Sequence, residues 1–151
     1  MTLVDVSRRR LLTIFSGLGY PHDVEVEGGY AYVTDEERGE LAVIDLRARR
    51  RVSRVAVGPR PHDLAVGDVA LVTHGPRAAY LTLVDLRNPR RPRVAGRIDP
   101  SGPAHDISEQ PDSATVYVTY WGSGLVGAVD WGERRLLWKR RVGSLVHHVQ
   151  L

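Results

Sequence analysis

The sequence predicts an all-β fold, a β-propeller of four-stranded antiparallel blades, and three observations support this. A His-Asp pair, or its altered copy, recurs at intervals of about 40 residues, a repeat length typical of propeller blades. The copies are Pro21-His22-Asp23, Pro61-His62-Asp63, Ala104-His105-Asp106 and Val146-His147-His148. The apolar residues between the copies fall in short alternating runs, as in half-buried strands. The 151 residues include 15 Gly and 9 Pro, which separate these runs as tight turns would.

Residues 1–18 are predicted to hold strands three and four of a leading blade. Thr2–Val6 and Leu11–Phe15 are short apolar runs on either side of an arginine-rich turn, and they match the later pair of runs within 41–57 without a gap. The segment SRRRLL at 7–12 also resembles the core of a twin-arginine export signal. The apolar run after it is short and no small-residue cleavage site follows, so we predict repeat structure here.

Three full blades are predicted at 21–58, 61–102 and 103–143. In the first of them, Val24 and Val26 alternate with glutamates, which is the period-two pattern of a strand. A Gly-Gly pair then supplies the hairpin turn, where a positive φ is needed. The runs YAYVT, LAVIDL and RVSRVAV follow as the second, third and fourth strands. The other blades repeat this order with VALVT, TLVDL and RVAGRI, and with TVYVT, GAVDW and LLWKRRV.

The last segment, 146–151, is predicted to be the first strand of a further blade. The single domain of 1–151 would then hold about three to four blades, whereas closed propellers usually have four to eight. Three interpretations follow: the chain is part of a longer propeller, two copies complete one ring, or 147–151 joins the N-terminal strands in a thin closing blade. The last lacks a second strand, so we expect an incomplete propeller or half-ring whose partners are further blades or a second copy.

Two motifs at the ends of second strands, YVTD at 32–35 and YVTY at 117–120, resemble the YVTN signature of bacterial surface-layer-type propellers. The stretch LVDLRNPRRPRVAGRID at 83–99 is similar to the LVIVD propeller repeat. The resemblance covers nearly the whole chain and implies a propeller fold, while such propellers serve structural, binding and enzymatic roles. It also implies a place outside the cytoplasm, although the sequence has no convincing signal peptide and leaves the compartment undecided.

The repeated His-Asp pairs are expected around one mouth of the central channel. In a four-stranded meander, the loop before strand one and the loop after strand two lie on the same face, and strand one lines the channel. The residues that end strand two should face the same mouth. The candidate ligand-binding residues there are His22, Asp23, Asp35, His62, Asp63, His74, His105, Asp106, Tyr120 and Trp121. Trp121 would serve either as an exposed platform for a ligand or as packing at the channel mouth.

Imidazole and carboxylate groups that converge on one axis are the groups that a transition-metal site uses. The candidate metal ligands are His22, His62, His105, His147 and His148, and a transition metal ion is the one cofactor that the sequence suggests. The competing interpretation is a fastener, in which each pair hydrogen-bonds the backbone of its own turn or of the next blade. Repetition in every blade favours the fastener, whereas the altered fourth copy slightly favours a site.

A second aspartate recurs near the end of each third strand, and we predict that it accepts hydrogen bonds in a turn or between blades. Its copies are Asp5, Asp45, Asp85 and Asp130. Arginine-rich clusters lie in these turns and on the outer strands, at 8–10, 47–51, 87–93 and 134–141. Charged outer strands protect sheet edges, and the alternative is a surface for a polyanion. The net charge of +3 is small and few aromatic residues accompany the clusters, so protection is favoured over nucleic-acid binding.

The sequence favours a protein without enzymatic activity, and we assign no catalytic residue. The chain has no cysteine, no glycine-rich phosphate loop, no GxSxG motif and no apolar run that would cross a membrane. We expect a non-catalytic binding or scaffold module whose loops at one channel mouth hold a protein, a small molecule or a carbohydrate. The alternatives are a metal- or cofactor-dependent enzyme of oxidoreductase type that uses the axial histidines, and polyanion binding by the outer arginines.

Overall fold

The computed structural model describes residues 1–110 and 113–150. All of the regular secondary structure in these residues lies in β-strands, numbered β1 to β14. The strands form three four-stranded antiparallel sheets and one hairpin, so the predicted all-β fold of propeller blades is confirmed. The described residues include no helix with the length and hydrophobicity that a membrane span requires.

A leading hairpin precedes three blades, and each blade is a meander in which consecutive strands pair. The leading hairpin consists of β1 (Thr2–Asp5) and β2 (Arg10–Ile14). The first blade consists of β3 (Pro21–Glu27), β4 (Tyr30–Asp35), β5 (Glu40–Asp45) and β6 (Arg50–Ala56). The second blade consists of β7 (Pro61–Val66), β8 (Val69–His74), β9 (Leu81–Asp85) and β10 (Arg93–Ile98). The third blade consists of β11 (Ala104–Glu109), β12 (Thr115–Tyr120), β13 (Leu125–Asp130) and β14 (Arg135–Arg141).

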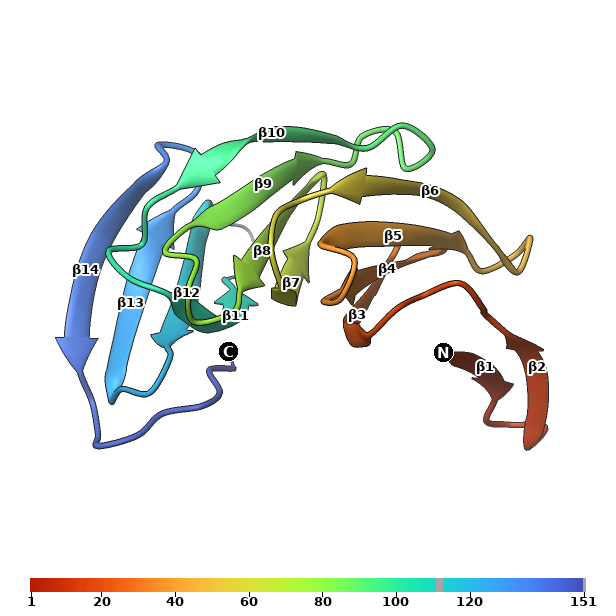
Figure 1. Ribbon diagram of the computed structural model, residues 1–151, viewed down its shortest axis with the longest axis horizontal. Coiled ribbons are helices and arrows are strands. Elements are labelled where there is room, and N and C mark those ends of the chain that lie inside the picture. The colour runs from red at the N-terminus through yellow and green to blue at the C-terminus, as the bar shows by residue number, and fades with distance from the viewer. Residues whose placement is uncertain (111–112, 151) are drawn as a thin grey trace.

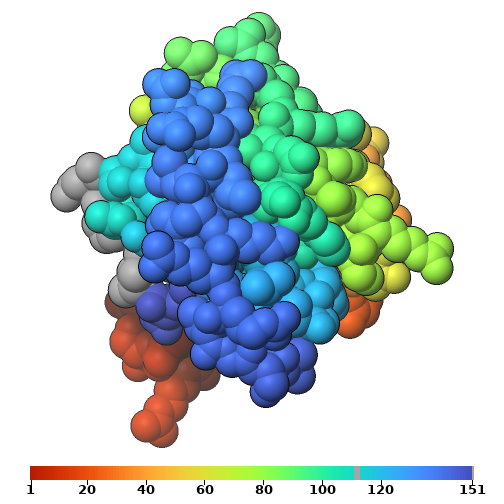
Figure 2. Space-filling model, turned by 90° about the vertical axis from the view of Figure 1, so that its left-hand side faces the viewer, coloured from red at the N-terminus to blue at the C-terminus, as the bar shows by residue number. Residues whose placement is uncertain are grey.

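The blades form an open arc, with the first strands β3, β7 and β11 toward its inner side and the fourth strands β6, β10 and β14 on its outer side (Figure 1). The first strands are neighbours, because β3 contacts β7 and β7 contacts β11. Figure 2 shows the end of the arc, where β14 runs over the surface beside residues of the second blade. Two hydrogen bonds join these blades there, from Arg134 to the Ala95 carbonyl and from Lys139 to the Ser101 carbonyl.

The apolar core lies between neighbouring blades, because each blade has two faces to cover and cannot bury them alone. The hairpin and the first blade share a core of Phe15, Ala31, Val33, Ala42 and Ile44. The first and second blades share Tyr32, Leu41, Val43, Val57, Leu64, Ala70, Val72, Val84 and Leu86. The second and third share Ala65, Leu71, Leu81, Leu83, Ile98, Ala104, Ile107, Val116, Val118, Tyr120 and Val129. A fully buried side chain such as Leu41 contributes about 2 kcal/mol through burial.

The C-terminal segment 146–150 has no assigned strand, although the sequence predicts one at 146–151. The segment nevertheless lies where a first strand would follow the third blade. The hydroxyl of Thr119 donates to the His147 carbonyl at 3.0 Å, and the Val149 amide donates to Asp106 Oδ2 at 2.6 Å. In the described part of the chain the segment has no second strand to pair with, and it does not pair with β1 or β2. Leu151 lies outside the described residues.

Candidate functional site

A buried threonine at the end of each second strand fastens its blade to the following one. Its Oγ1 donates to the backbone carbonyl of the repeated histidine in the next copy, at 2.6 to 3.0 Å. The same oxygen accepts the amide of the repeated aspartate in its own blade, at 2.9 to 3.1 Å. The threonines are Thr34, Thr73 and Thr119, the histidines are His62, His105 and His147, and the aspartates are Asp23, Asp63 and Asp106. This fastener uses the backbone carbonyl of each histidine, and at His105 the ring adds a contact with the next copy, since its Nδ1 lies 2.9 Å from the His147 carbonyl.

The repeated aspartates make a second link between copies, and one of them departs from the pattern. Asp23 Oδ2 accepts the Leu64 amide of the second blade at 3.0 Å, and Asp106 Oδ2 accepts the Val149 amide at 2.6 Å. Among the described residues, the carboxylate of Asp63 makes no equivalent hydrogen bond to the third blade. The carboxylate of Asp63 therefore does not link its blade to the next copy through an amide, as the carboxylates of Asp23 and Asp106 do.

The carboxylate of Asp63 lies instead beside two imidazoles. Its Oδ1 is 3.4 Å from His22 Nδ1 and 3.2 Å from His62 Nδ1. Burial alone would raise the pKa of the Asp63 carboxyl, but the neighbouring imidazoles, His62 above all, lower that pKa. Because His22 lies on β3 and the two other residues lie on β7, the group spans the boundary between the first and second blades.

His62 is the most enclosed member of this group, with 8% of its surface exposed. Its Nδ1 has no hydrogen-bond partner among the described residues, since the approach to Asp63 lacks hydrogen-bond geometry. The His22 ring lies against the His62 ring with the centroids 3.7 Å apart. On another side Trp121 packs edge-on, at 4.9 Å, and is held by a bond from its Nε1 to the His74 carbonyl. Trp121 therefore serves as packing for the histidines.

The remaining metal candidates lie further along the same row and are differently engaged. His105 Nδ1 lies 2.9 Å from the His147 carbonyl, and burial lowers the pKa of His105. The His147 ring meets the His105 ring edge-on at 5.2 Å. His148 is 82% exposed at its side chain, with Nδ1 3.5 Å from Asp106 Oδ2. The five rings thus form one row, in which the His105 ring lies 4.9 Å from the His62 ring, but the described residues whose ligand atoms lie close enough to share an ion are His22, His62 and Asp63.

The sequence predicts that the residues ending the second strands face the channel mouth. The structure instead buries them inside their own blades. Asp35 accepts the amides of Gly19 and Tyr20 at 2.7 and 3.0 Å. Burial alone would raise the pKa of Asp35, but these amides lower it. The hydroxyl of Tyr120 donates to the Pro100 carbonyl at 2.6 Å, and burial raises the pKa of Tyr120 to about 12. Both side chains hold the loop that precedes strand one of their blade.

His74 takes the same position in the second blade and is completely buried. Its Nδ1 lies 2.9 Å from the Pro59 carbonyl, and its Nε2 lies 2.9 Å from the hydroxyl of Thr82. Burial lowers the pKa of His74 below the ordinary value of 6.5. The folded chain therefore holds this imidazole neutral at a pH where the unfolded chain already binds a proton.

This difference predicts that stability falls as the pH drops below 6.5. Between the lowered pKa of the folded chain and 6.5, the unfolded state binds more protons, so the free energy of unfolding decreases by up to about 1.4 kcal/mol per pH unit for one group. Urea unfolding at pH 7.5 and pH 5.5 measures the loss. The variant His74→Gln should lose less stability between these two pH values than the wild type. An equal loss in both proteins would contradict this role for His74.

The rim of loops before strand one and after strand two carries two adjoining hollows that share Arg60. One has a volume of 490 Å³ and is lined by Tyr20, Glu36, Glu37 and Arg60. The other has a volume of 390 Å³ and is lined by Pro59, Arg60, Gly75, Pro76, Arg77 and Ala78. Glu36 accepts hydrogen bonds from Arg60 Nε at 2.9 Å and Nη2 at 2.5 Å, which fixes the guanidinium. The histidine repeat does not predict these lining residues, because they lie beside the repeated pairs and not in them.

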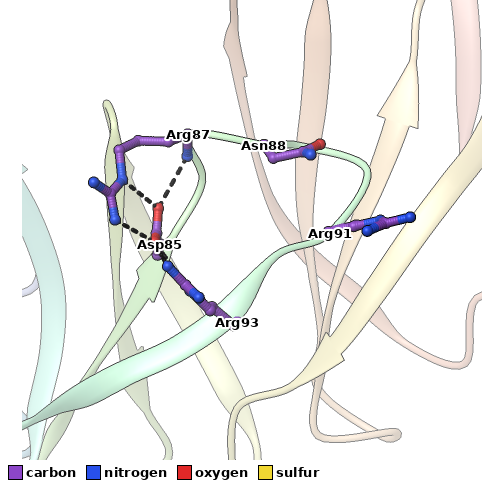
Figure 3. Close-up of a pocket in the computed structure, with 5 residues that line it drawn as sticks. All are labelled: Asp85, Arg87, Asn88, Arg91 and Arg93. Atoms are coloured by element: carbon purple, nitrogen blue, oxygen red, sulfur yellow. Dashed lines mark hydrogen bonds and ion pairs between the residues drawn. The ribbon is translucent and has the colours of Figure 1, made fainter.

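The repeated third-strand aspartates accept an amide in the turn that follows, at 2.8 to 3.2 Å, so the predicted turn role is confirmed. At Asp85 the turn encloses a hollow of 430 Å³ (Figure 3). Arg87 and Arg93 point at the carboxylate of Asp85, whereas Arg91 points away from it. Hydrogen bonds from Arg87, and then from Arg93, lower the pKa of Asp85. The carboxylate of Asp85 thus offsets one of the two positive charges that these arginines bring.

Comparison with known proteins agrees with this architecture. A family model described as the LVIVD repeat matches residues 18–47, which covers the first strands of the first blade. A search of curated proteins found no match. Among solved structures, hydrazine synthase of Kuenenia stuttgartiensis superposes with a TM-score of 0.81 and 21% identity, over 93% of this chain and 42% of that chain.

Two further solved structures share the fold at lower identity. The β-propeller domain of Cps50 (Swd1) from Myceliophteria thermophila has a TM-score of 0.72 and 12% identity, over 86% of this chain and 46% of that one. A functionally unknown protein from Desulfotomaculum acetoxidans DSM 771 has a TM-score of 0.79 and 12% identity, over 96% of this chain and 50% of that one. This chain therefore spans half or less of each of these structures. Its fold is a partial β-propeller, and its first blade contains a match to the LVIVD repeat.

Proposed function

We propose that this propeller segment is a non-catalytic binding module that holds a small polar ligand, with carbohydrate as the favoured class, at the loop rim of the first and second blades. The observation that carries the proposal is the pair of adjoining hollows around Arg60. A volume of 490 Å³ lies in the range of about 300–1,000 Å³ that small-molecule sites occupy. Loops on a rigid β scaffold are also where binding residues concentrate.

The chemistry of the larger hollow suits a ligand with hydroxyl groups and one apolar face. Tyr20 is 58% exposed and presents a flat ring with a polar edge. Glu36 and Glu37 supply acceptors for hydroxyl donors, and the guanidinium of Arg60 supplies donors in a planar fork.

The proposal predicts a carbohydrate that raises the melting temperature of the protein and whose binding depends on Tyr20. We expect that a panel of mono- and oligosaccharides, screened by thermal shift and followed by calorimetry, yields such a ligand. The variant Tyr20→Ala should weaken its binding by about five- to thirtyfold, because the loss of one aromatic contact and its buried area removes about 1–2 kcal/mol.

Two control variants sharpen this test. Tyr20→Phe keeps the ring and should retain most of the affinity. Val94→Ala removes a comparably exposed apolar side chain from the outer strand β10 and should leave binding unchanged. A panel without any ligand whose binding depends on Tyr20, or equal losses in Tyr20→Ala and Val94→Ala, would contradict the proposed function.

A further inference from the structure

We propose that His22, His62 and Asp63 bind a divalent first-row transition metal ion, such as Zn²⁺, across the boundary between the first and second blades. The site goes beyond the proposed function, because it lies on the inner strands β3 and β7 and shares no residue with the rim hollows. Two imidazoles and one carboxylate are a ligand set that zinc and related metals use when a further position stays open.

The positions of the ligand atoms fit a tetrahedral ion. With metal–ligand distances of about 2.0–2.1 Å, neighbouring ligand atoms in a tetrahedron lie about 3.4 Å apart. Asp63 Oδ1 lies 3.4 Å from His22 Nδ1 and 3.2 Å from His62 Nδ1. All three residues can offer ligand atoms that lie within 4.8 Å of one another. A small closure of the group would therefore bring all three atoms to one ion.

A second observation is the unsatisfied nitrogen of His62. Its Nδ1 is buried, has no hydrogen-bond partner among the described residues, and lies on the Asp63 side of the ring. A buried polar atom without a partner costs folding free energy, so its presence calls for a ligand. A metal ion between Nδ1 and the carboxylate would satisfy both groups at once.

The third observation is that Asp63 differs from the two other repeated aspartates in what its carboxylate binds. Asp23 and Asp106 use a carboxylate oxygen to bind an amide of the following copy, whereas the carboxylate of Asp63 has no such bond among the described residues. A dication at Asp63 would give this carboxylate the partner that its two counterparts find in an amide.

The open coordination position would face the inner side of the arc. The side chain of His22 is 29% exposed, whereas that of His62 is 10% exposed. Trp121 closes one side of His62, so a water molecule or an external ligand would approach from the side of His22.

The direct test is a titration of Co²⁺ into chelator-stripped protein produced without a histidine tag. We expect one equivalent of Co²⁺ to bind with the intense visible absorption of a tetrahedral ion, and Zn²⁺ to displace it. Proton NMR of the wild type should then show shifted resonances for two of the six histidines. Saturation with Zn²⁺ should raise the melting temperature, because the ion binds the folded chain.

Variants separate this site from the rest of the histidine row. Asp63→Asn and His22→Ala should each weaken Co²⁺ binding by at least about tenfold, since each removes one of three ligands. His22 is partly exposed, so its replacement should leave the fold intact. Asp23→Asn, at the same repeat position in the first blade, and His148→Ala, at the exposed end of the row, should change the affinity by less than about threefold.

Three results would overturn the proposal. The first is a wild type that binds no stoichiometric Co²⁺ or Zn²⁺. The second is binding that Asp63→Asn and His22→Ala leave intact. The third is binding that depends on His148, which would place the ion at the other end of the row.

Discussion

Replacement of Thr73 by valine is expected to destabilise the chain by about 3 kcal/mol. Valine keeps the shape of threonine but removes the hydroxyl that joins the second blade to the third. Thr73 is completely buried, donates to the His105 carbonyl at 2.7 Å and accepts the Asp63 amide at 2.9 Å. Both backbone groups would then be buried without a partner, and each unsatisfied group costs about 1–3 kcal/mol. Urea unfolding followed by circular dichroism measures the loss.

Two further substitutions test this explanation of the fastener. Thr73→Ser keeps the hydroxyl and loses one methyl group, so it should cost only about 1 kcal/mol. Thr119→Val makes the same change where the hydroxyl binds the C-terminal segment and not a complete blade, and it should cost less than Thr73→Val. If Thr73→Ser and Thr73→Val were equally destabilising, the lost packing and not the hydrogen bonds would explain the effect.

Replacement of Gly124 by alanine is expected to cost a similar amount, about 3 kcal/mol, for a steric reason. Gly124 lies in the loop between β12 and β13, and its carbonyl accepts the Val142 amide at 2.8 Å. A Cβ at this position would overlap the Gly143 carbonyl and lie 3.0 Å from the Ser144 amide nitrogen. Since these contacts are backbone, the end of β14 would have to move, and overpacking of this kind costs about 1–3 kcal/mol or more.

The matched control is Gly67, in the turn between β7 and β8. A Cβ there would meet no atom within 4 Å. Gly67→Ala should therefore change the free energy of unfolding by no more than about 1 kcal/mol. The change can even be stabilising, because alanine lowers the conformational entropy of the unfolded chain. Equal losses at the two positions would show that the flexibility of glycine, and not the close approach to Gly143, explains the effect of Gly124→Ala.

Much of the fold follows from the sequence, because repetition multiplies weak signals. One alternating run such as Val24–Val26 predicts little alone, but the same order of runs three times over leaves few folds besides a propeller. Of the first strand predicted at 146–151, residues 146–150 form no strand, because the described part of the chain holds no second strand beside them to pair with. Its place next to the third blade is nevertheless the one that the repeat indicates, as the bond to His147 shows.

The site is harder to predict, because its function depends on differences between copies that look alike. The letters His-Asp are identical at His22-Asp23 and His62-Asp63, yet one carboxylate binds an amide and the other faces two rings. The fastening threonine precedes Asp35 in the first blade, and its counterparts precede His74 and Tyr120. This recurring threonine could have been found in the sequence, but the direction of its hydroxyl depends on the distance between blades.

The open arc has a consequence for how the chain gains and loses structure. The free energy of folding of such an arc is approximately a sum. Each blade contributes an intrinsic stability, and each boundary between neighbouring blades contributes a coupling term. In the described structure the second blade has a four-stranded blade on each side and its inner strand β7 is largely buried, whereas the inner strand β3 of the first blade is mostly exposed. Local opening should therefore begin at β3 more readily than at β7. An ion held by His22, His62 and Asp63 would strengthen one coupling term only, so that the first two blades would open as a single cooperative unit.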